Sequence, residues 1–195
     1  MTTSGITNSP IIGVDNFHIA KLLTDPVNGK ATYDEVISFP WLRSVSIVPQ
    51  TDDATLYADN QAVDTANVTS RYSLTIDTAT LPLEYKALLL GHTIENGVMT
   101  VTSEDNAPYF AIMFETTKRN GKKRYVKFLK VRFSEPSETA QTKEEGVTYN
   151  TPSMTATAIY RNDKKAIYQA DEEADGYVST TGANWYASVD MESGD

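Results

Sequence analysis

Cysteine is absent from this sequence, and histidine occurs only twice. The lack of cysteine excludes disulfide bonds and thiolate metal sites, and nothing else in the chain indicates an oxidising compartment. The two histidines, His18 and His92, lie far apart in the sequence, so we expect neither a zinc site nor a histidine-based catalytic triad. We interpret His18 as a strand residue and His92 as a residue that follows a helix end.

Long apolar runs are also missing. No stretch approaches the roughly 20 apolar residues that a helix needs to cross a bilayer, so we expect no membrane partner. The beginning of the sequence, MTTSGITNSP, has no basic region and no apolar core, which is not the pattern of a signal peptide. We therefore expect that the protein is made and folded in a cytoplasm.

Catalytic and cofactor motifs are missing too. The sequence contains no GxSxG element, P-loop or dinucleotide fingerprint. Residues 171–176 imitate the start of a calcium loop, but the twelfth position, where a bidentate glutamate belongs, is Gly182. The aspartates of residues 51–64 could pair for glycoside hydrolysis, although loose carboxylates in a polar segment are a weak signal. We therefore expect no enzyme, no cofactor and no bound metal.

The charge of the chain is unevenly distributed. The formal net charge is −9, yet eight of the 17 lysines and arginines lie within residues 116–134, which contain no acid. The rest of the chain carries nine bases against 26 acids. A basic hairpin on an acidic body could bind nucleic acid or pair with an acidic face of a neighbouring copy. The acidic total and the lack of an RNP-like aromatic motif argue against nucleic-acid recognition.

That basic stretch belongs to the strongest structural signal, a long hairpin over residues 107–133. Its centre is Asn120-Gly121, which predicts a type I′ turn. The first arm is continuously apolar over residues 109–114, as expected of a strand covered on both faces. In the second arm the apolar positions change parity. Either its first half is covered on both faces, or a bulge near Phe128-Leu129 switches the faces, and we favour the bulge.

The remaining pattern predicts further hairpins and one helix. The helix covers residues 82–90, with Pro82 in its first turn and Gly91 as the left-handed residue at its end. The expected strands are residues 17–23 paired with 30–39, 43–48 ended by Pro49, 71–77, 92–95 paired with 98–102, and 151–160 paired with 165–169 around Asn162-Asp163. These elements predict a mainly β fold, an antiparallel β-sandwich with one flanking α-helix.

Four segments lack this periodicity. We expect a flexible N-terminal arm over residues 1–16 and an acidic C-terminal tail over residues 171–195, with a single β-sandwich domain, residues 17–170, between them. Within the domain, residues 51–68 and 134–146 are expected to form long polar arms or loops. In the tail, Trp185-Tyr186 is the only strong apolar anchor.

The order of segments from Ser73 to Thr155 resembles a known family. The matching stretches are SLTIDTATLPLEYKALLLG, HTIENGVMTV, the long hairpin with its polar continuation to Gly146, and TPSMTATAIY, with SVSIVPQTDDATLYADN before them. Together they are similar to the major tail protein, the tail-tube subunit, of long-tailed non-contractile bacteriophages of Gram-positive hosts. The resemblance covers about three quarters of the chain and includes no catalytic motif.

The resemblance implies a structural virion protein in the phage tail. Such subunits self-assemble into stacked hexameric rings, and the resulting tube, with a commonly acidic lumen, is a conduit for DNA ejection into the host. The implied partners are further copies of the chain, the tape measure, the tail tip and the tail terminator. DNA is implied only as non-specific cargo in the lumen, and synthesis is expected in the host cytoplasm.

In this interpretation the polar arms and the basic hairpin tip supply contacts between copies. The candidate assembly contacts are Asp52, Asp53, Tyr57, Lys122, Lys123, Arg124, Glu138, Lys143, Glu144 and Glu145. The alternative is a β-sandwich carbohydrate-binding or receptor-binding module of a phage particle, with Trp41 or Trp185-Tyr186 as a sugar platform. A tube subunit would polymerise without ligand, whereas a binding module would stay small.

Overall fold

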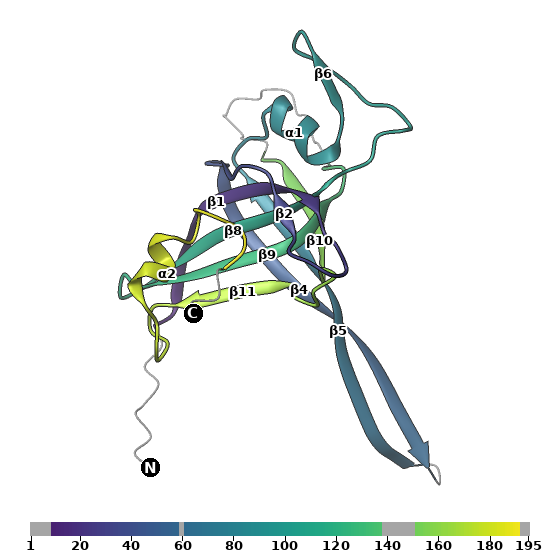
Figure 1. Cartoon of the computed structure of the whole chain (residues 1–195), viewed down its shortest axis with the longest axis vertical. Helices are drawn as coiled ribbons and strands as arrows, with labels where there is room; N and C mark the ends of the chain where they lie inside the picture. The colour runs from purple at the N-terminus through teal and green to yellow at the C-terminus, as the bar shows by residue number, and fades with distance from the viewer. Residues whose placement is uncertain (1–8, 59–60, 138–150, 192–195) are drawn as a thin grey trace, which may run out of the picture.

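The computed structural model describes residues 9–58, 61–137 and 151–191, and within these ranges it describes only the backbone of residues 53–66. The strands are β1 (Ile11–Thr24), β2 (Thr32–Tyr33), β3 (Ile37–Ser38), β4 (Leu42–Ala58), β5 (Gln61–Thr78), β6 (Thr93–Glu95), β7 (Val98–Thr100), β8 (Tyr109–Lys118), β9 (Lys123–Phe133), β10 (Ser153–Ile159) and β11 (Ile167–Asp171). The helices are α1 (Leu83–Leu90) and α2 (Ser179–Ala183). Figure 1 shows their arrangement.

One antiparallel sheet contains all the described strands except the small β6–β7 hairpin, and its main order is β2-β1-β8-β9-β10-β5-β4. Strand β9 pairs with β8 along one edge. Along its other edge it pairs first with β11 and then, at its end, with β10. The sheet divides at this point, and β10, β5 and β4 bend round until β4 contacts β1. The predicted mainly β, antiparallel fold is confirmed, and its two facing layers belong to one bent sheet.

The main hydrophobic core lies between these two layers. The rings of Phe17 in β1 and Phe114 in β8 stack with centroids 6.4 Å apart. They belong to the same buried cluster as Leu74 and Ile76 of β5, and all four side chains are almost completely withdrawn from water. Burial of this apolar surface is the main force that holds the two layers together.

Helix α1 closes one end of the core, where Figure 1 shows it beside the sheet. Its residues Leu89 and Leu90 are buried in the core cluster. Phe39, Trp41 and Tyr85 pack edge to face with one another, with ring centroids 5.2–5.3 Å apart. Such aromatic pairs stabilise a contact beyond simple burial. Trp41 therefore anchors the helix against the core.

The predicted helix is confirmed with almost the same bounds. Pro82 is its N-cap, and Gly91 follows it in the left-handed conformation with φ 78°. A Cβ atom on Gly91 would lie 2.5 Å from the carbonyl oxygen of Asn106, so only glycine fits there. The sequence pattern did not indicate the short second helix, α2. No helix in the described ranges is long and apolar enough to cross a membrane.

The central hairpin is confirmed, and so is its bulge. Phe110 lies opposite Val131 whereas Ile112 lies opposite Phe128, so β9 holds one extra residue at this point. The bulge returns Val131 to the core face already occupied by Phe128, while Leu129 lies in a second cluster on the opposite face. The first half of β9 is also covered on both faces, because residues 125–129 are all buried. The parity change in the sequence thus reflects both a bulge and a strand half that is covered on both faces.

The predicted turn type at the end of this hairpin is wrong. Gly121 has φ 80°, but Asn120 does not have the positive φ that a type I′ turn requires. The N–H of Gly121 donates to the carbonyl of Lys118, and the N–H of Lys118 donates to the carbonyl of Lys122. This arrangement is a three-residue loop in which glycine occupies the left-handed bulge position.

Two of the segments expected to be irregular contain long strands. Residues 11–16 belong to β1, and residues 51–58 and 61–68 form the outer part of the β4–β5 hairpin. Pro49 does not end a strand but pairs opposite Tyr72 within β4. Proline is tolerated there because β4 is the last strand of the sheet and needs hydrogen bonds on one side only.

The expected last hairpin is also corrected. Strands β10 and β11 follow each other in sequence, but each pairs with β9 rather than with the other. The chain then covers the outer face of the sheet. There Trp185 and Val189 pack with Met113, Tyr125 and Leu129 in the second apolar cluster. The described part of the acidic tail, up to residue 191, is thus a packed segment held by the anchor that the sequence indicated.

Replacing Trp185 should show how much the packed C-terminal segment contributes to the stability of the fold. Its side chain is 1% exposed, and truncation of a buried tryptophan to alanine costs about 3–5 kcal/mol, so Trp185→Ala should lower the free energy of unfolding by that amount. Trp185→Phe should cost clearly less, because the indole N–H has no hydrogen-bond partner among the described residues. Urea unfolding of both variants checks this. If the two variants lose the same unfolding free energy, burial of the aromatic ring is not what stabilises this contact.

Candidate assembly surfaces

The most prominent surface feature is the outer part of the β4–β5 hairpin, the ribbon, which Figure 1 shows projecting from the body of the protein. Its backbone pairing continues from Asp52 opposite Val68 to Ala58 opposite Gln61. Among the described residues, no third strand pairs with this part of the hairpin. An isolated two-stranded ribbon is marginally stable in water. The ribbon therefore has the character of an element that gains its stability from a partner.

Three predicted contact residues lie on this ribbon. Asp52 is exposed at its base, and Asp53 and Tyr57 follow on the same strand, with their backbones opposite Asn67 and Ala62. The structure thus brings these residues together on one projecting element. The contact role predicted for them remains a prediction.

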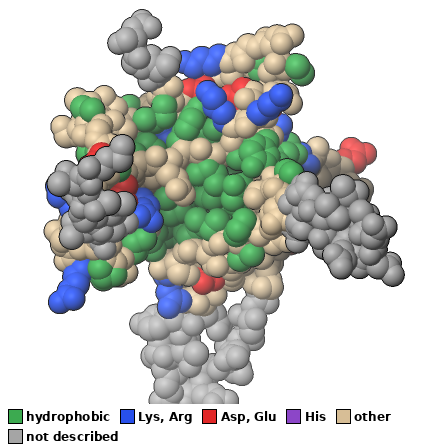
Figure 2. All heavy atoms as spheres, turned by 90° about the horizontal axis from the view of Figure 1, so that it is seen from below, with side chains coloured by type: hydrophobic (Ala, Val, Ile, Leu, Met, Phe, Trp, Pro, Cys, Tyr) green, Lys and Arg blue, Asp and Glu red, His purple; other side chains and the backbone are tan. Residues whose placement is uncertain are grey.

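A second candidate surface is a groove of about 500 Å³ between the start of β1 and the first half of β4. Its lining includes the apolar side chains of Ile11, Ile12, Val45 and Ile47. Ile12 is 68% exposed, which is unusual for an isoleucine in a strand. Figure 2, viewed from the ribbon side, shows hydrophobic side chains gathered in a broad area of the surface. Apolar patches of this kind mark interaction surfaces.

The basic hairpin tip is largely neutralised within the subunit. The ammonium group of Lys118, whose side chain is 0% exposed, lies 2.5 Å from Asp171 and 2.6 Å from Glu173. Arg124 also contacts Asp171, at 2.8 Å, and Lys123 lies 2.5 Å from Glu115. The acids that imitate a calcium loop therefore bind lysine and arginine side chains. Among the described residues, no group of three potential ligands is placed to hold a metal ion.

These ion pairs change the electrostatics of Asp171. Burial alone would raise the pKa of its carboxyl group, but hydrogen bonds from Lys118, the Glu173 backbone and Arg124 outweigh this and lower the pKa to about 2. The carboxylate is therefore charged at neutral pH. Its charge serves to fix the C-terminal segment to the hairpin.

The predicted contacts at the tip thus separate into two groups. Lys122 is exposed and available to a neighbouring copy, as is Arg119 beside it. Lys123 and Arg124 contact acids of their own chain, so reversing their charge would disturb the subunit itself. The other predicted contacts, Glu138, Lys143, Glu144 and Glu145, lie outside the described residues.

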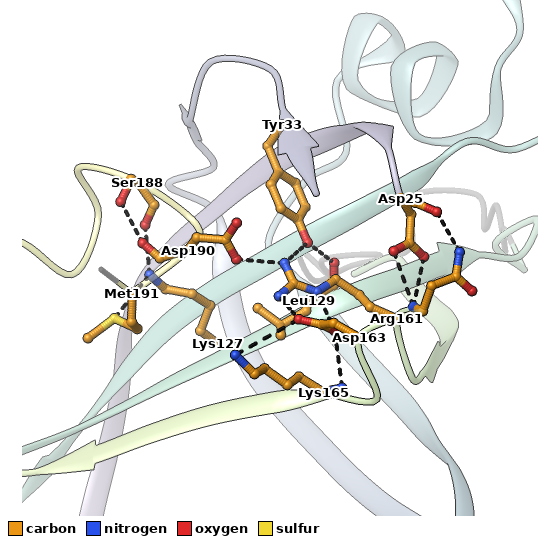
Figure 3. Close-up of polar contacts among 11 residues, drawn as sticks. Asp25, Tyr33, Lys127, Leu129, Arg161, Asp163, Lys165, Ser188, Asp190 and Met191 are labelled. Carbon is orange, nitrogen blue, oxygen red and sulfur yellow. Dashed lines mark hydrogen bonds and ion pairs between the residues drawn. The ribbon is translucent and has the colours of Figure 1, made fainter. Parts of the chain in front are cut away.

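Two more cations lie beneath the C-terminal segment, as Figure 3 shows. Lys127 donates a hydrogen bond to the carbonyl of Ser188 at 2.7 Å and lies over the Trp185 ring. Burial lowers its pKa to about 8. Arg161 binds Asp163 through two nitrogens and contacts Asp190 at 2.6 Å. The sequence of the hairpin alone does not indicate that the C-terminal segment buries the side chain of Lys127.

The histidines lie as their interpretations predicted. His18 is a β1 residue whose ring packs 4.4 Å from that of Tyr186. His92 follows the end of α1, where its backbone N–H donates to the carbonyl of Ala87. Its ring contacts Asp105 and Glu135.

Taken together, the bent antiparallel sheet, the projecting ribbon and the exposed groove define a mainly β protein with two candidate contact surfaces. The chain matches the family model "Phage tail tube protein" over residues 50–184. It therefore belongs to the phage tail tube protein family, and its role is that of a structural component of a phage tail tube.

Solved structures of tube assemblies resemble the chain at low identity. A chain from the PVC sheath-tube complex, an extracellular contractile injection system in its extended state, is 13% identical. The match covers 88% of this chain and 99% of that chain, with a TM-score of 0.44. A chain from the tube-terminating cap of the anti-feeding prophage is 11% identical over 85% and 93% of the two chains, also with a TM-score of 0.44. No curated protein matched the sequence. The family assignment rests on the family model alone.

Neutralising Lys118 should test the internal charge network. Lys118→Met keeps the length of the side chain but leaves two partly buried carboxylates without their shared cation, and we expect a loss of about 2–4 kcal/mol in unfolding free energy. Lys122→Met, four residues away on the exposed tip, should change it by less than about 0.5 kcal/mol. Chemical denaturation of the two variants makes the comparison, and equal stabilities would contradict a structural role for Lys118.

Proposed function

We propose that this chain is the subunit of a phage tail tube, in which hexameric rings stack to form the conduit for DNA ejection. The tail-tube family match over residues 50–184 carries this proposal. We assign the tube to a long-tailed non-contractile phage of a Gram-positive host, because the succession of segments resembles that group. The chain is made in the host cytoplasm, acts in the virion without catalysing a reaction, and joins tape-measure, tail-tip and terminator proteins.

The arrangement of the surfaces supports stacking. Rings that stack in one direction need head-to-tail contacts, which join two different surfaces of the subunit. The ribbon projects from one end of the protein, and α1 with the β6–β7 hairpin lies at the other end (Figure 1). At that other end, Val98 and Val101 are 64% and 59% exposed. In a stack, the ribbon of one copy reaches this end of the next.

The overall charge agrees with a conduit. The chain has a formal net charge of −9, and six of the eight bases in the basic stretch contact carboxylates or aromatic rings of the same subunit: Lys118, Lys123, Arg124, Lys127, Lys130 and Arg132. Free cations bind DNA through its phosphates, so pairing them internally reduces the attraction of passing DNA. DNA is therefore cargo and not a ligand.

Two exposed valines offer a sharp test of the ribbon. Val68, at the base of the ribbon, is 63% exposed, and Val27, in the β1–β2 connection, is 77% exposed. Val68→Lys should leave the subunit folded but reduce tube formation, because a charge would enter the contact between rings. Val27→Lys should assemble normally. Negative-stain electron microscopy over a rising concentration series, with tail-tip complex added as an initiator, measures the number of tubes.

Deletion of the ribbon is a stronger test of its role in stacking. Replacing residues 53–66 with a two-residue glycine turn removes the ribbon but leaves the paired strands below it, so circular dichroism and thermal unfolding should stay close to those of the original chain. We expect no tubes from this variant. If it forms tubes as readily as the full chain, the ribbon is not the stacking contact. If the unaltered chain forms no tubes even with the initiator, the proposed function is wrong.

A further inference from the structure

One imidazole joins three segments of the chain at the α1 end of the protein. His92 follows α1, Asp105 lies in the β7–β8 loop, and Glu135 lies just after β9. The Nδ1 atom of His92 is 2.7 Å from Asp105 Oδ2, and the Nε2 atom is 3.2 Å from Glu135 Oε2. The His92 side chain is only 6% exposed, so most of the ring is shielded from water.

The two carboxylates are held differently. Asp105 accepts hydrogen bonds from the backbone N–H and the hydroxyl of Thr102, at 2.9 and 2.6 Å, and is 13% exposed. Glu135 is 54% exposed, and its other oxygen lies 3.1 Å from the ammonium group of Lys86 in α1. Asp105 is therefore a fixed partner of His92, whereas Glu135 can move away into water.

Hydrogen-bond chemistry restricts the protonation state that satisfies both contacts. A carboxylate only accepts hydrogen bonds, and a neutral imidazole has only one N–H. With both ring nitrogens facing carboxylates, the neutral ring would direct a lone pair at one of them. The imidazolium ion donates from both nitrogens and satisfies both contacts. The geometry thus describes a charged histidine.

We propose that His92 is a pH-sensitive clamp that, when protonated, fixes the segment after β9 to the end of α1 and the β7–β8 loop. Loss of one proton keeps the Nδ1–H bond to Asp105 and gives up the bond to Glu135, because Asp105 is the closer and more fixed partner. Among the described residues, Glu135 then keeps its contact with Lys86. The segment from Ser134 to Ser137, which bonds to β10 at Thr155 and Ser153, becomes easier to detach.

The direction of the pKa shift of His92 agrees with such a clamp. Burial alone would lower the pKa of His92, but its hydrogen bonds to Asp105 and Glu135 outweigh burial and raise the pKa above 6.5. A group whose pKa is raised by folding stabilises the folded state fully below its unfolded pKa, and this contribution disappears as the pH rises through the folded value. The clamp is therefore closed below the pKa of His92 and opens as the pH rises through it.

Nuclear magnetic resonance titration of the full chain tests the clamp. In the unaltered protein, the His92 ring and the Glu135 carboxyl carbon should titrate together at a pH above 6.5. Glu135→Gln should lower the His92 pKa, because a neutral amide stabilises the imidazolium less than a carboxylate does. Glu104→Gln, a matched change at an exposed acid in the same loop, should leave it unchanged.

Amide hydrogen exchange gives a second, independent measurement. Once the intrinsic effect of pH is removed, exchange at Ser134, whose N–H bonds to the Thr155 carbonyl, should accelerate as the pH passes the His92 pKa. In Glu135→Gln this acceleration should move to lower pH with the titration of His92. A His92 pKa at or below 6.5, equal shifts in the Gln variants of Glu135 and Glu104, or exchange at Ser134 that ignores His92 would each overturn the proposal. All these readings concern the monomer and are independent of tube formation.

Discussion

The shared edge of β9 is the constraint on which the rest of the fold depends. Because β11 pairs with the first half of this edge and β10 with its end, the sheet has to divide there. One branch bends over to enclose the core with β5 and β4, and the other provides the outer face on which the C-terminal segment packs. The bulge in β9 lies at the division and returns Val131 to the same core as Phe128.

Charge pairing inside the subunit follows from this division. Strand β11 ends at Asp171, directly beside Arg124 at the start of β9, and the following acids reach Lys118. Lys118 and Arg124, which lie in a stretch without a single acid, are thus paired with acids from a distant part of the chain. The same packing holds Lys127 and Arg161 beneath the cover, so that segment is joined to the sheet by polar contacts as well as by Trp185. Such paired buried charges are satisfied rather than exposed for binding.

Local signals in the sequence predicted local structure well, and longer-range features less well. Pro82 and Gly91 bound the helix because each has a backbone preference that acts within one turn. The parity change in β9 predicted a bulge because the side-chain period of a strand is two. Pairing of β10 with β9 rather than β11 depends on a sheet edge far away in sequence, which no local pattern encodes. The burial of Lys118 was missed for the same reason.

The ribbon was taken for an irregular arm because it lacks the feature on which strand prediction relies. Alternation of apolar and polar residues arises where one face of a strand packs on a core. Beyond Pro49 the described side chains of the β4–β5 pair, at residues 50–52 and 67–70, lie outside the buried core while the backbone pairing continues. Contact with the core therefore does not impose alternation at these positions. In the tube that we propose, neighbouring copies provide the missing packing. The segment that looks least like folded structure in the sequence is therefore the one whose composition suits contact with another subunit.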